Sequence, residues 1–384
     1  MLTKIISVSL LLFLTFLSGC APAQLNKTEG VSSEYESKNS EKSEELQSSE
    51  ATEIKQVSIY QGDFELPLDG ATGYASVALD VKNDLSTSST VLSQLNPGAV
   101  FTILKEQDDW LQIQTETIIG WVQKPYILIN LPDVIPSIIY KNTNVDSSVF
   151  RSSGESIPNI TDSSLYDSKG YNTRLNREEY IMPVLFPMAK KIMAAQKMAL
   201  NENNTLIIYE GFRPFSVQMK IAEELQKLAL SNPEVMQGIS QAPWSIDWFI
   251  STKVSNHQGG YAIDVGLGKV IQLGEEIIGN YLIKPVVNYE EYLMQTNIHE
   301  LSTQSAIYSA PVTVHSSTAW EQAIALPAVN QYTFLLQKYM TNNGLTPLAS
   351  EWWHFNDLDS LNLLNGTLGT GEFILNKTAS KLPN

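Results

Sequence analysis

The chain contains a single cysteine, Cys20, and this limits both how the fold can be held and what can bind a metal. One cysteine cannot form an intramolecular disulfide, even in an oxidising compartment. A zinc site in the folded part cannot use thiolates, so its ligands must be histidine, aspartate or glutamate side chains. The length of 384 residues suggests about two domains.

The N-terminal segment has the features of a signal peptide. Lys4 supplies a positive charge, and the apolar run after it is too short and wrongly flanked for a typical membrane-spanning helix. The run ends at Leu17-Ser18-Gly19-Cys20, which resembles a bacterial lipoprotein lipobox. This resemblance implies removal of residues 1–19, a lipid on the Cys20 sulfur, and an extracytoplasmic protein anchored to the bacterial cell membrane. The alternative is an ordinary secretory signal with an incidental cysteine.

Residues 20–55 are predicted to form a disordered tether. They are rich in Ser, Glu and Lys and almost free of large apolar side chains. Such a stretch cannot bury enough surface to offset its ordering entropy. The formal net charge of the chain is -16, which argues against nucleic acid as a partner.

Residues 56–129 are predicted to form a small β-barrel. Short apolar runs alternate with turn signals such as Asn96-Pro97-Gly98, as in an all-β fold. The stretch from LDVKNDL to the closing GWVQKPYI resembles a bacterial SH3 domain, which implies a binding module, often for cell-wall polymer. Three aromatic residues are either an exposed platform for that polymer or part of the core: Trp110, Trp121 and Tyr126.

Residues 135–378 are predicted to form a second domain that mixes helices and strands. Helical periodicity over 176–200 is interrupted by Pro183 and Pro187, and each proline should end or kink a helix. The remaining pattern predicts helices over 216–230 and 331–343, the second ended by Gly344, and strands over 204–209 and 352–355.

Five side chains in this domain form a coherent chemical set. His257 and Asp264 in SNHQGGYAIDVG, with His354 in SEWWHFN, are ligands suited to zinc and leave a fourth position for water. Glu351 can act as the base, since zinc lowers the pKa of its bound water to about 7. Arg213 in EGFRPF offers a positive fork for the oxyanion of a tetrahedral intermediate. Taken singly, each of these signals is also typical of ordinary loop or core residues.

The order of these motifs resembles the zinc D-alanyl-D-alanine peptidases, which include vancomycin-resistance-type dipeptidases and related D,D-carboxypeptidases. The shared pattern is Gly-aromatic-Arg-Pro, then Ser-x-His-x-x-Gly-x-Ala-x-Asp, then Glu-x-x-His. The resemblance implies an α+β fold whose antiparallel sheet, with flanking helices, carries one Zn²⁺. It implies His257, Asp264 and His354 as the metal ligands. The roles that it implies for the other residues are Glu351 as general base and acid, Arg213 as transition-state stabiliser, Ser255 near the substrate and Glu210 orienting the arginine.

One position departs from the dipeptidase pattern. The family carries an aspartate there that meets the free ammonium of the dipeptide, whereas this chain has His299 followed by Glu300. We expect these two residues near the substrate, with Glu300 as a substitute acid, although His299 is equally an ordinary surface side chain. His315 has no counterpart in the family and is expected to be structural.

The predicted location favours peptidoglycan stem peptides over the free dipeptide as substrate. A tethered wall-binding lipoprotein meets the cell wall, so we expect a D,D-carboxypeptidase that removes the terminal D-alanine. The alternatives are a D-Ala-D-Ala dipeptidase, a stem-peptide endopeptidase, and a non-catalytic wall-binding lipoprotein. In a regular strand, residues three apart face opposite sides, so a twist or bulge is expected between Glu351 and His354.

Overall fold

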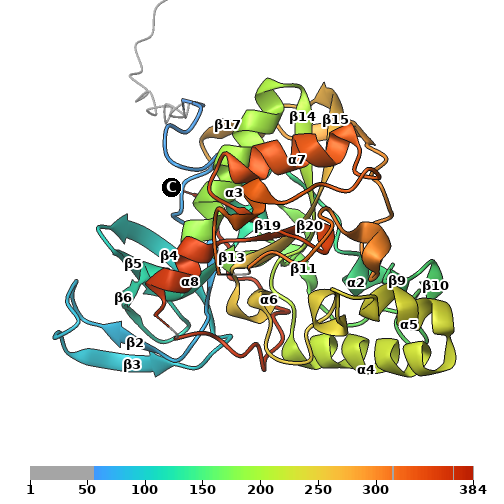
Figure 1. Cartoon of the computed structure of the whole chain (residues 1–384). Helices are drawn as coiled ribbons and strands as arrows, with labels where there is room; N and C mark the ends of the chain where they lie inside the picture. Colours follow the sequence, from blue (N-terminus) through green and yellow to red (C-terminus); the bar gives the residue numbers. More distant parts are fainter. Residues whose placement is uncertain (1–55, 314, 366, 384) are drawn as a thin grey trace, which may run out of the picture. The chain divides into compact units, whose positions relative to one another are not determined.

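The computed structural model describes residues 56–313, 315–365 and 367–383. These residues belong to one compact unit that spans Ile54–Asn384 (Figure 1). The predicted signal peptide, the tether and Cys20 lie outside the described residues. Within the described part, no helix is both long and apolar enough to cross a membrane.

The first sheet contains eight strands paired in antiparallel fashion, in the order β13-β7-β1-β4-β5-β6-β2-β3. Its tight turns use residues that tolerate positive φ, Gly98 at 80° and Asp108 at 50°. An antiparallel sheet of short strands is the arrangement predicted for residues 56–129. The strands are β1 (Thr72–Ala75), β2 (Leu79–Lys82), β3 (Val91–Leu95), β4 (Val100–Gln107), β5 (Trp110–Gln114), β6 (Ile119–Gln123), β7 (Ile127–Asn130) and β13 (Pro183–Leu185).

The three aromatic residues of this sheet region differ in exposure. Trp110 is only 8% exposed and packs in the interior, which fits the core interpretation. Trp121 and Tyr126 are partly exposed, so they keep surface that a ligand can reach. The core interpretation therefore fits Trp110 alone, and the platform for a polymer stays a prediction for the other two.

The second sheet carries the residues of the predicted metal site. Its order is β19-β20-β15-β14-β8, with β18 also paired to β15; β8 is parallel to β14 and the other pairs are antiparallel. The strands are β8 (Ile139–Tyr140), β14 (Asn204–Glu210), β15 (Ala262–Leu273), β18 (Val286–Glu291), β19 (Thr346–Leu348) and β20 (Glu351–Asn356). The other described strands form three two-stranded sheets: β9 (Arg151–Ser152) with β10 (Glu155–Ser156), β11 (Lys169–Asn172) with β12 (Arg177–Tyr180), and β16 (Glu276–Ile278) with β17 (Tyr281–Ile283).

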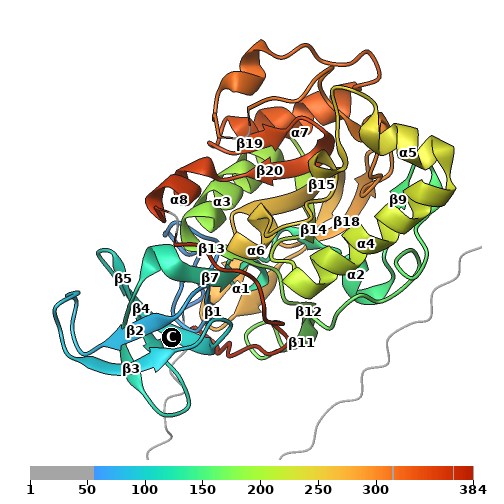
Figure 2. The ribbon, with the colours of Figure 1, turned by 60° about the horizontal axis from the view of Figure 1, so that its bottom comes forward.

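Four longer helices flank this sheet: α3 (Phe186–Asn201), α4 (Phe215–Ser231), α5 (Pro233–Ser240) and α7 (Gln331–Thr341). α3 contacts both β14 and α7, whereas α4 packs with α5 on another side (Figures 1 and 2). The short helices are α1 (Leu131–Val134), α2 (Thr143–Asp146), α6 (Asn256–Gly259), α8 (Leu358–Leu363) and the 3-10 turns η1 (Lys124–Tyr126), η2 (Ile246–Trp248), η3 (Thr303–Ser305) and η4 (Ala319–Gln322).

Prolines set the boundaries in the region where the sequence pattern was ambiguous. The helical periodicity over 176–200 does not give one helix, because residues 177–180 form β12 and Pro183 begins β13. Pro187 lies in the first turn of α3, where its missing N–H costs nothing. At the other end of the domain, Gly344 takes φ 77° just beyond the end of α7, as expected for a helix stop.

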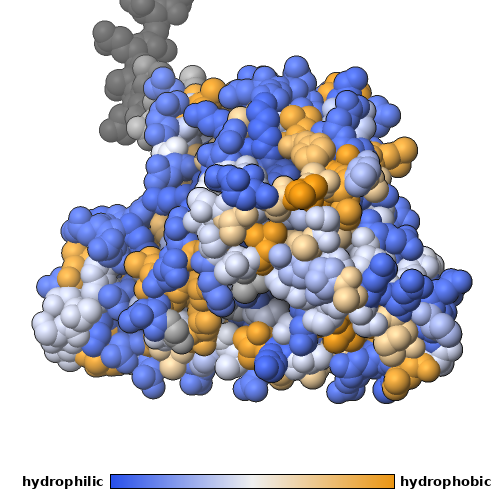
Figure 3. All heavy atoms as spheres, in the orientation of Figure 1, coloured by the Kyte–Doolittle hydropathy of each residue, from blue (hydrophilic) through white to orange (hydrophobic). Residues whose placement is uncertain are grey.

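The segment after α8 ties the two sheets together. The backbone carbonyls of Lys377 and Ala379 accept hydrogen bonds from Tyr74 and Thr102 of the first sheet, at 2.9 and 2.6 Å. The Gly371 carbonyl accepts from the backbone N–H at the start of α4, at 2.9 Å. One hydrophobic cluster also includes residues from both sheets. The regions predicted as two domains therefore share one core, and on the face shown in Figure 3 hydrophobic side chains appear as small patches among hydrophilic ones.

Candidate metal centre

Three buried side chains from separate elements converge on one point. His257 lies in α6, Asp264 in β15 and His354 in β20, and the last two sit directly opposite each other in an antiparallel pair. His257 Nε2 lies 3.2 Å from His354 Nδ1 and 3.4 Å from Asp264 Oδ1, and His354 Nδ1 lies 3.2 Å from the same oxygen. The structure thus brings together the three residues predicted as ligands.

Gly260 explains why glycines separate the first two of these residues. It caps α6 with φ 75°, a conformation that glycine adopts at no steric cost. A Cβ at this position would lie 2.2 Å from Cδ2 of Leu128, a residue of β7 in the first sheet, and would therefore clash with it. The chain therefore turns from the histidine of α6 into β15 within a space that admits no side chain.

The hydrogen bond on the outer side of each imidazole determines which ring nitrogen carries the proton. The other ring nitrogen then has a lone pair that faces inward. His257 Nδ1 lies 2.7 Å from the Gly211 carbonyl oxygen, which can only accept. His354 Nε2 lies 3.1 Å from Asn356 Oδ1, an oxygen that also accepts from Asn256 at 2.7 Å. Both outer nitrogens are therefore the protonated ones, and both inner nitrogens offer electron pairs.

The charges in the centre suit a cation. Burial lowers the pKa of His257, which keeps its imidazole neutral. Burial opposes the charged form of Asp264, yet its surroundings, which include the hydrogen bond with His299, hold its pKa well below the usual range. A neutral imidazole and an ionised carboxylate are the forms in which these groups bind metal.

Glu351 begins β20 beside the three ligands. Its Oε2 lies 3.6 Å from His354 Nδ1, and burial, followed by the negative charge of Asp264, raises its pKa well above the usual range. The strand is irregular here, because Pro347 pairs with Phe355 while the next residue of β19 pairs with Glu351 itself. The predicted bulge between Glu351 and His354 is confirmed, and it lets both side chains face the same pocket.

Arg213 is held by acceptors on three elements. Its Nε donates to Glu210 Oε2 at 2.5 Å, Nη1 to Gln218 Oε1 at 2.7 Å, and Nη2 to Asp264 Oδ2 at 3.2 Å. Burial lowers the pKa of Arg213, but the charges of Glu210 and Asp264 outweigh it and raise the pKa. Three of five N–H groups are used in this way, and the side chain also lines the pocket.

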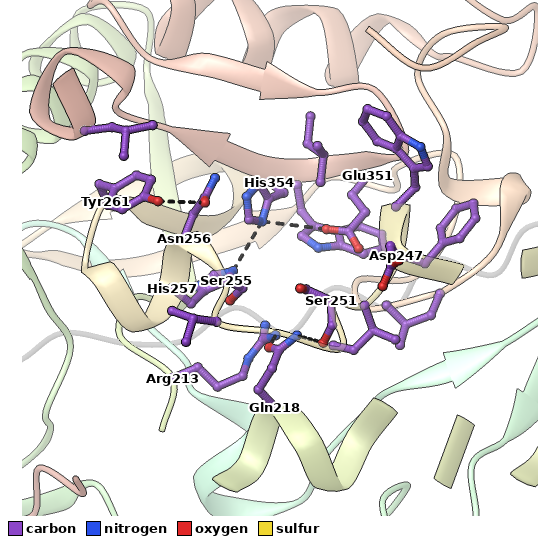
Figure 4. Close-up of a pocket in the computed structure, with 18 of the residues that line it drawn as sticks. Arg213, Gln218, Asp247, Ser251, Ser255, Asn256, His257, Tyr261, Glu351 and His354 are labelled. Carbon is purple, nitrogen blue, oxygen red and sulfur yellow. Dashed lines mark hydrogen bonds and ion pairs between the residues drawn. The ribbon is translucent and has the colours of Figure 1, made fainter. Parts of the chain in front are cut away.

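A pocket of about 510 Å³ opens at this centre. Figure 4 shows His354 and Glu351 on one side of it, Arg213 and Gln218 on the opposite side, and Asp247 at one edge. The stretch from Asp247 to Ser251 contributes a run of lining residues that sequence reasoning missed, because these residues match no motif. His315 also lines the pocket, which was not expected from the sequence.

The four residues predicted to contact substrate occupy different places. Ser255 lines the pocket, and its hydroxyl has no hydrogen-bond partner among the described residues. Glu210 lies buried behind Arg213, where it accepts from the guanidinium, as the orienting role requires. His299 and Glu300, which were expected near the substrate, are not among the residues that line the pocket. His299 is buried behind Asp264, and Glu300 accepts hydrogen bonds from the backbone N–H groups of residues 153 and 154.

A second group of candidate ligands, Glu210, Asp264 and His299, shares one member with the first. Here the Arg213 guanidinium already bonds to both carboxylates, at 2.5 and 3.2 Å. The positive charge that this group needs is therefore supplied by the protein, and the first group remains the candidate for a metal.

A second pocket, of about 360 Å³, lies on the first sheet. It is lined by aromatic, charged and small polar side chains, including Trp110, Tyr126, Asp80, Lys82 and Thr367. Asp80 and Lys82 form an ion pair at 3.2 Å.

Comparison with known proteins identifies one segment of the chain. The family model described as bacterial SH3 domain matches residues 78–127, which run from just before β2 to the first residue of β7. This agrees with the resemblance found in the sequence and with the antiparallel sheet. No curated protein matches the chain.

Proposed function

We propose that this protein is a zinc peptidase that hydrolyses D-alanyl-D-alanine bonds in cell-wall peptides, acting as a D,D-carboxypeptidase on stem peptides. One observation carries the proposal. Three electron-pair donors, two imidazole nitrogens and one carboxylate oxygen, face one another at 3.2 to 3.4 Å. With no proton between them this arrangement is unfavourable, and a cation bound by all three removes the repulsion. Tetrahedral zinc bonds of about 2.0–2.1 Å give ligand–ligand edges of about 3.3–3.4 Å, close to these distances.

The residues fit zinc in chemistry as well as in spacing. His257, Asp264 and His354 would hold the ion, with a fourth position open to the pocket. When bound, the ion supplies Lewis-acid activation of a water molecule and of the scissile carbonyl. The motif order of the chain, which resembles the zinc D-alanyl-D-alanine peptidases, assigns the same three ligands.

Glu351 would move the proton in this reaction. Its carboxylate takes a proton from the attacking water as the C–O bond forms, and burial favours the protonated form that results. The same carboxyl then delivers the proton to the nitrogen of the leaving D-alanine as the C–N bond breaks. Water and peptide thus give a new carboxylic acid and a free amine, which ionise to a carboxylate and an ammonium, and Glu351 returns to its starting state.

Arg213 would stabilise the negative charge that develops on the carbonyl oxygen. It lines the pocket opposite Glu351, and its contacts with Glu210 and Gln218 hold the guanidinium in place (Figure 4). No described residue accepts from its remaining N–H groups. They can donate to an oxyanion without reorganisation, which is the condition for effective electrostatic catalysis. Ser255 also lines this pocket, with its hydroxyl oxygen buried.

The pocket supports the carboxypeptidase over the dipeptidase in one respect. The two residues expected to meet a free ammonium, His299 and Glu300, lie away from it. Asp247 favours the alternative, because it is an exposed carboxylate on the pocket wall. Its Oδ1 accepts from Thr252 at 3.0 Å, so its other oxygen remains able to accept from an ammonium.

The two activities can be separated with the purified chain lacking residues 1–20, loaded with zinc. We would offer free D-Ala-D-Ala and a pentapeptide ending in D-Ala-D-Ala in parallel, and measure released D-alanine. The carboxypeptidase proposal predicts faster cleavage of the pentapeptide, and none by the His354→Ala variant. Cleavage of the free dipeptide alone, lost in Asp247→Asn, would establish the dipeptidase. No cleavage of either substrate by a zinc-loaded, folded protein would favour the non-catalytic alternative.

We further propose that the SH3-like segment binds cell-wall polymer and that a lipid on Cys20 anchors the protein outside the cytoplasm. Bacterial SH3 domains commonly have wall ligands, and Trp121 and Tyr126 keep exposed aromatic surface. Co-sedimentation of the protein with purified cell walls should fall in a Trp121→Ala, Tyr126→Ala double variant. Membrane association should be lost in Cys20→Ser; unchanged association would contradict the lipid anchor.

A further inference from the structure

His299 is held rigidly beside the candidate metal centre. Its side chain is 0% exposed and stacks on Phe150, with ring centroids 4.2 Å apart and an interplanar angle of 13°. Trp353 and Tyr209 meet it edge-on at 5.9 and 6.4 Å. Its backbone takes φ 61°, an uncommon conformation for a residue with a side chain. Aromatic neighbours on several sides thus leave the imidazole one orientation.

The surroundings of the ring also set its tautomer. Nε2 lies 3.2 Å from Asp264 Oδ2, and Nδ1 has no hydrogen-bond partner among the described residues. A proton on Nδ1 would leave a buried donor unsatisfied and would point the Nε2 lone pair at a carboxylate. The proton therefore belongs on Nε2, where it is donated to Asp264.

This hydrogen bond divides the two oxygens of Asp264 between two tasks. Oδ1 faces His257 Nε2 and His354 Nδ1, at 3.4 and 3.2 Å. Oδ2 accepts from His299 and from Arg213, both at 3.2 Å. A carboxylate held at Oδ2 by two donors cannot rotate, so Oδ1 stays directed at the other two ligands.

We propose that His299 is a positioning residue for the metal centre, which locks Asp264 so that only Oδ1 binds the ion. The inference rests on the proposed zinc site. It explains why a histidine is suitable at the position where the resembled dipeptidases carry an ammonium-binding acid: the side chain here points to a metal ligand and away from the substrate pocket. Donors to a metal-binding carboxylate typically change metal affinity by about 10–100-fold.

Two substitutions separate the hydrogen bond from the packing. His299→Phe keeps an aromatic ring against Phe150 but has no N–H. His299→Gln removes the ring but places an amide N–H near the position of Nε2. Tyr140→Phe serves as the matched control, since it also removes one hydrogen-bond donor and keeps an aromatic ring, at a residue that does not line the pocket.

The test is the zinc dissociation constant, measured by competition with a chromophoric chelator. We expect about 10–100-fold weaker binding in His299→Phe, less than about tenfold in His299→Gln, and no change in Tyr140→Phe. Wild-type affinity in a folded His299→Phe would overturn the inference while leaving the zinc site intact. A wild-type protein that binds no zinc would overturn the proposed function and this inference together.

A measurement on the wild-type protein covers the case in which the variants fail to fold. Long-range ¹H–¹⁵N correlation spectra report which imidazole nitrogen carries the proton. We expect the His299 proton on Nε2 in the metal-free and in the zinc-loaded protein. A proton on Nδ1, with Nε2 unprotonated, would contradict the proposal directly.

Discussion

Replacing Glu351 by glutamine removes the proposed proton carrier while changing little else. The two side chains have nearly the same volume, and the site is only 6% exposed, so the neutral amide avoids any cost of burying charge. The distance from Glu351 Oε2 to His354 Nδ1 is 3.6 Å, which is longer than a hydrogen bond. We therefore expect the free energy of unfolding to change by less than about 1 kcal/mol. Zinc affinity should stay close to that of the wild-type protein, because Glu351 is not among the three ligands.

Catalysis should respond very differently. General acid–base groups contribute about 10²–10⁴-fold, which is about 2.7–5.4 kcal/mol of transition-state free energy at about 1.36 kcal/mol per tenfold. The loss should appear in kcat for D-alanine release from the pentapeptide, measured with zinc-saturated protein. Glu290→Gln, an exposed glutamate on β18, is the matched control and should keep full activity. A Glu351→Gln variant with half or more of the wild-type kcat would refute the assignment of the base.

Three further predictions concern Arg213, the turn at Gly260 and the buried carboxyl group of Glu65. Arg213→Lys should lower kcat by about 10²–10³-fold with zinc retained, because an ammonium cannot reproduce the fork between Glu210 and Gln218; unchanged kcat would contradict the oxyanion role. Gly260→Ala should lower the free energy of unfolding by about 1–3 kcal/mol in chemical denaturation, since φ 75° and a Cβ 2.2 Å from Leu128 both oppose a side chain; wild-type stability would show that the turn can relax. Glu65 has its pKa raised to about 7 by burial, against hydrogen bonds from Ser137, so the folded state holds its proton longer than the unfolded state does. Its contribution to the free energy of unfolding is full below about pH 4.5 and is lost as the pH rises through about 7. This change of about 1–3 kcal/mol should be absent in Glu65→Gln. Equal slopes of the free energy of unfolding against pH in the two proteins would contradict this.

The sequence pattern predicted which three side chains come together but not the contacts that orient them. His257, Asp264 and His354 are separated by up to 97 residues, yet the motif order was enough to nominate them. The partners that direct their lone pairs inward, the Gly211 carbonyl and Asn356, become visible only when the strands pair. A backbone carbonyl carries no signal in the sequence, and Asn356 resembles any other polar residue at the end of a strand.

The direction of the His299 side chain has a physical cause that the sequence does not reveal. Alignment to a family motif places a residue near a site, but it does not say toward which side of the site the side chain points. His299 turns toward Asp264, because Phe150 and Trp353 pack around its ring behind the three converging side chains. The apolar periodicity over 176–200 also overlooked the strand at 177–180, which pairs with the preceding strand β11 in a hairpin.

The amino-acid composition also does not predict that the first sheet extends past the boundary between the two predicted regions. The match to a bacterial SH3 domain covers residues 78–127, but the sheet that contains them extends to β13, which follows the connector. The segment after α8 returns to bond Tyr74 and Thr102. These long-range contacts are hydrogen bonds to backbone carbonyl groups. Every residue has such a group, so a sequence pattern does not reveal which ones will pair.

The central claim is that two imidazoles and one carboxylate hold a single zinc ion. Anomalous diffraction at the zinc edge, on crystals grown with one equivalent of zinc, tests it most directly. The account predicts one peak about 2.0–2.2 Å from His257 Nε2, Asp264 Oδ1 and His354 Nδ1. A zinc-supplemented crystal with no anomalous peak among these three atoms would contradict it.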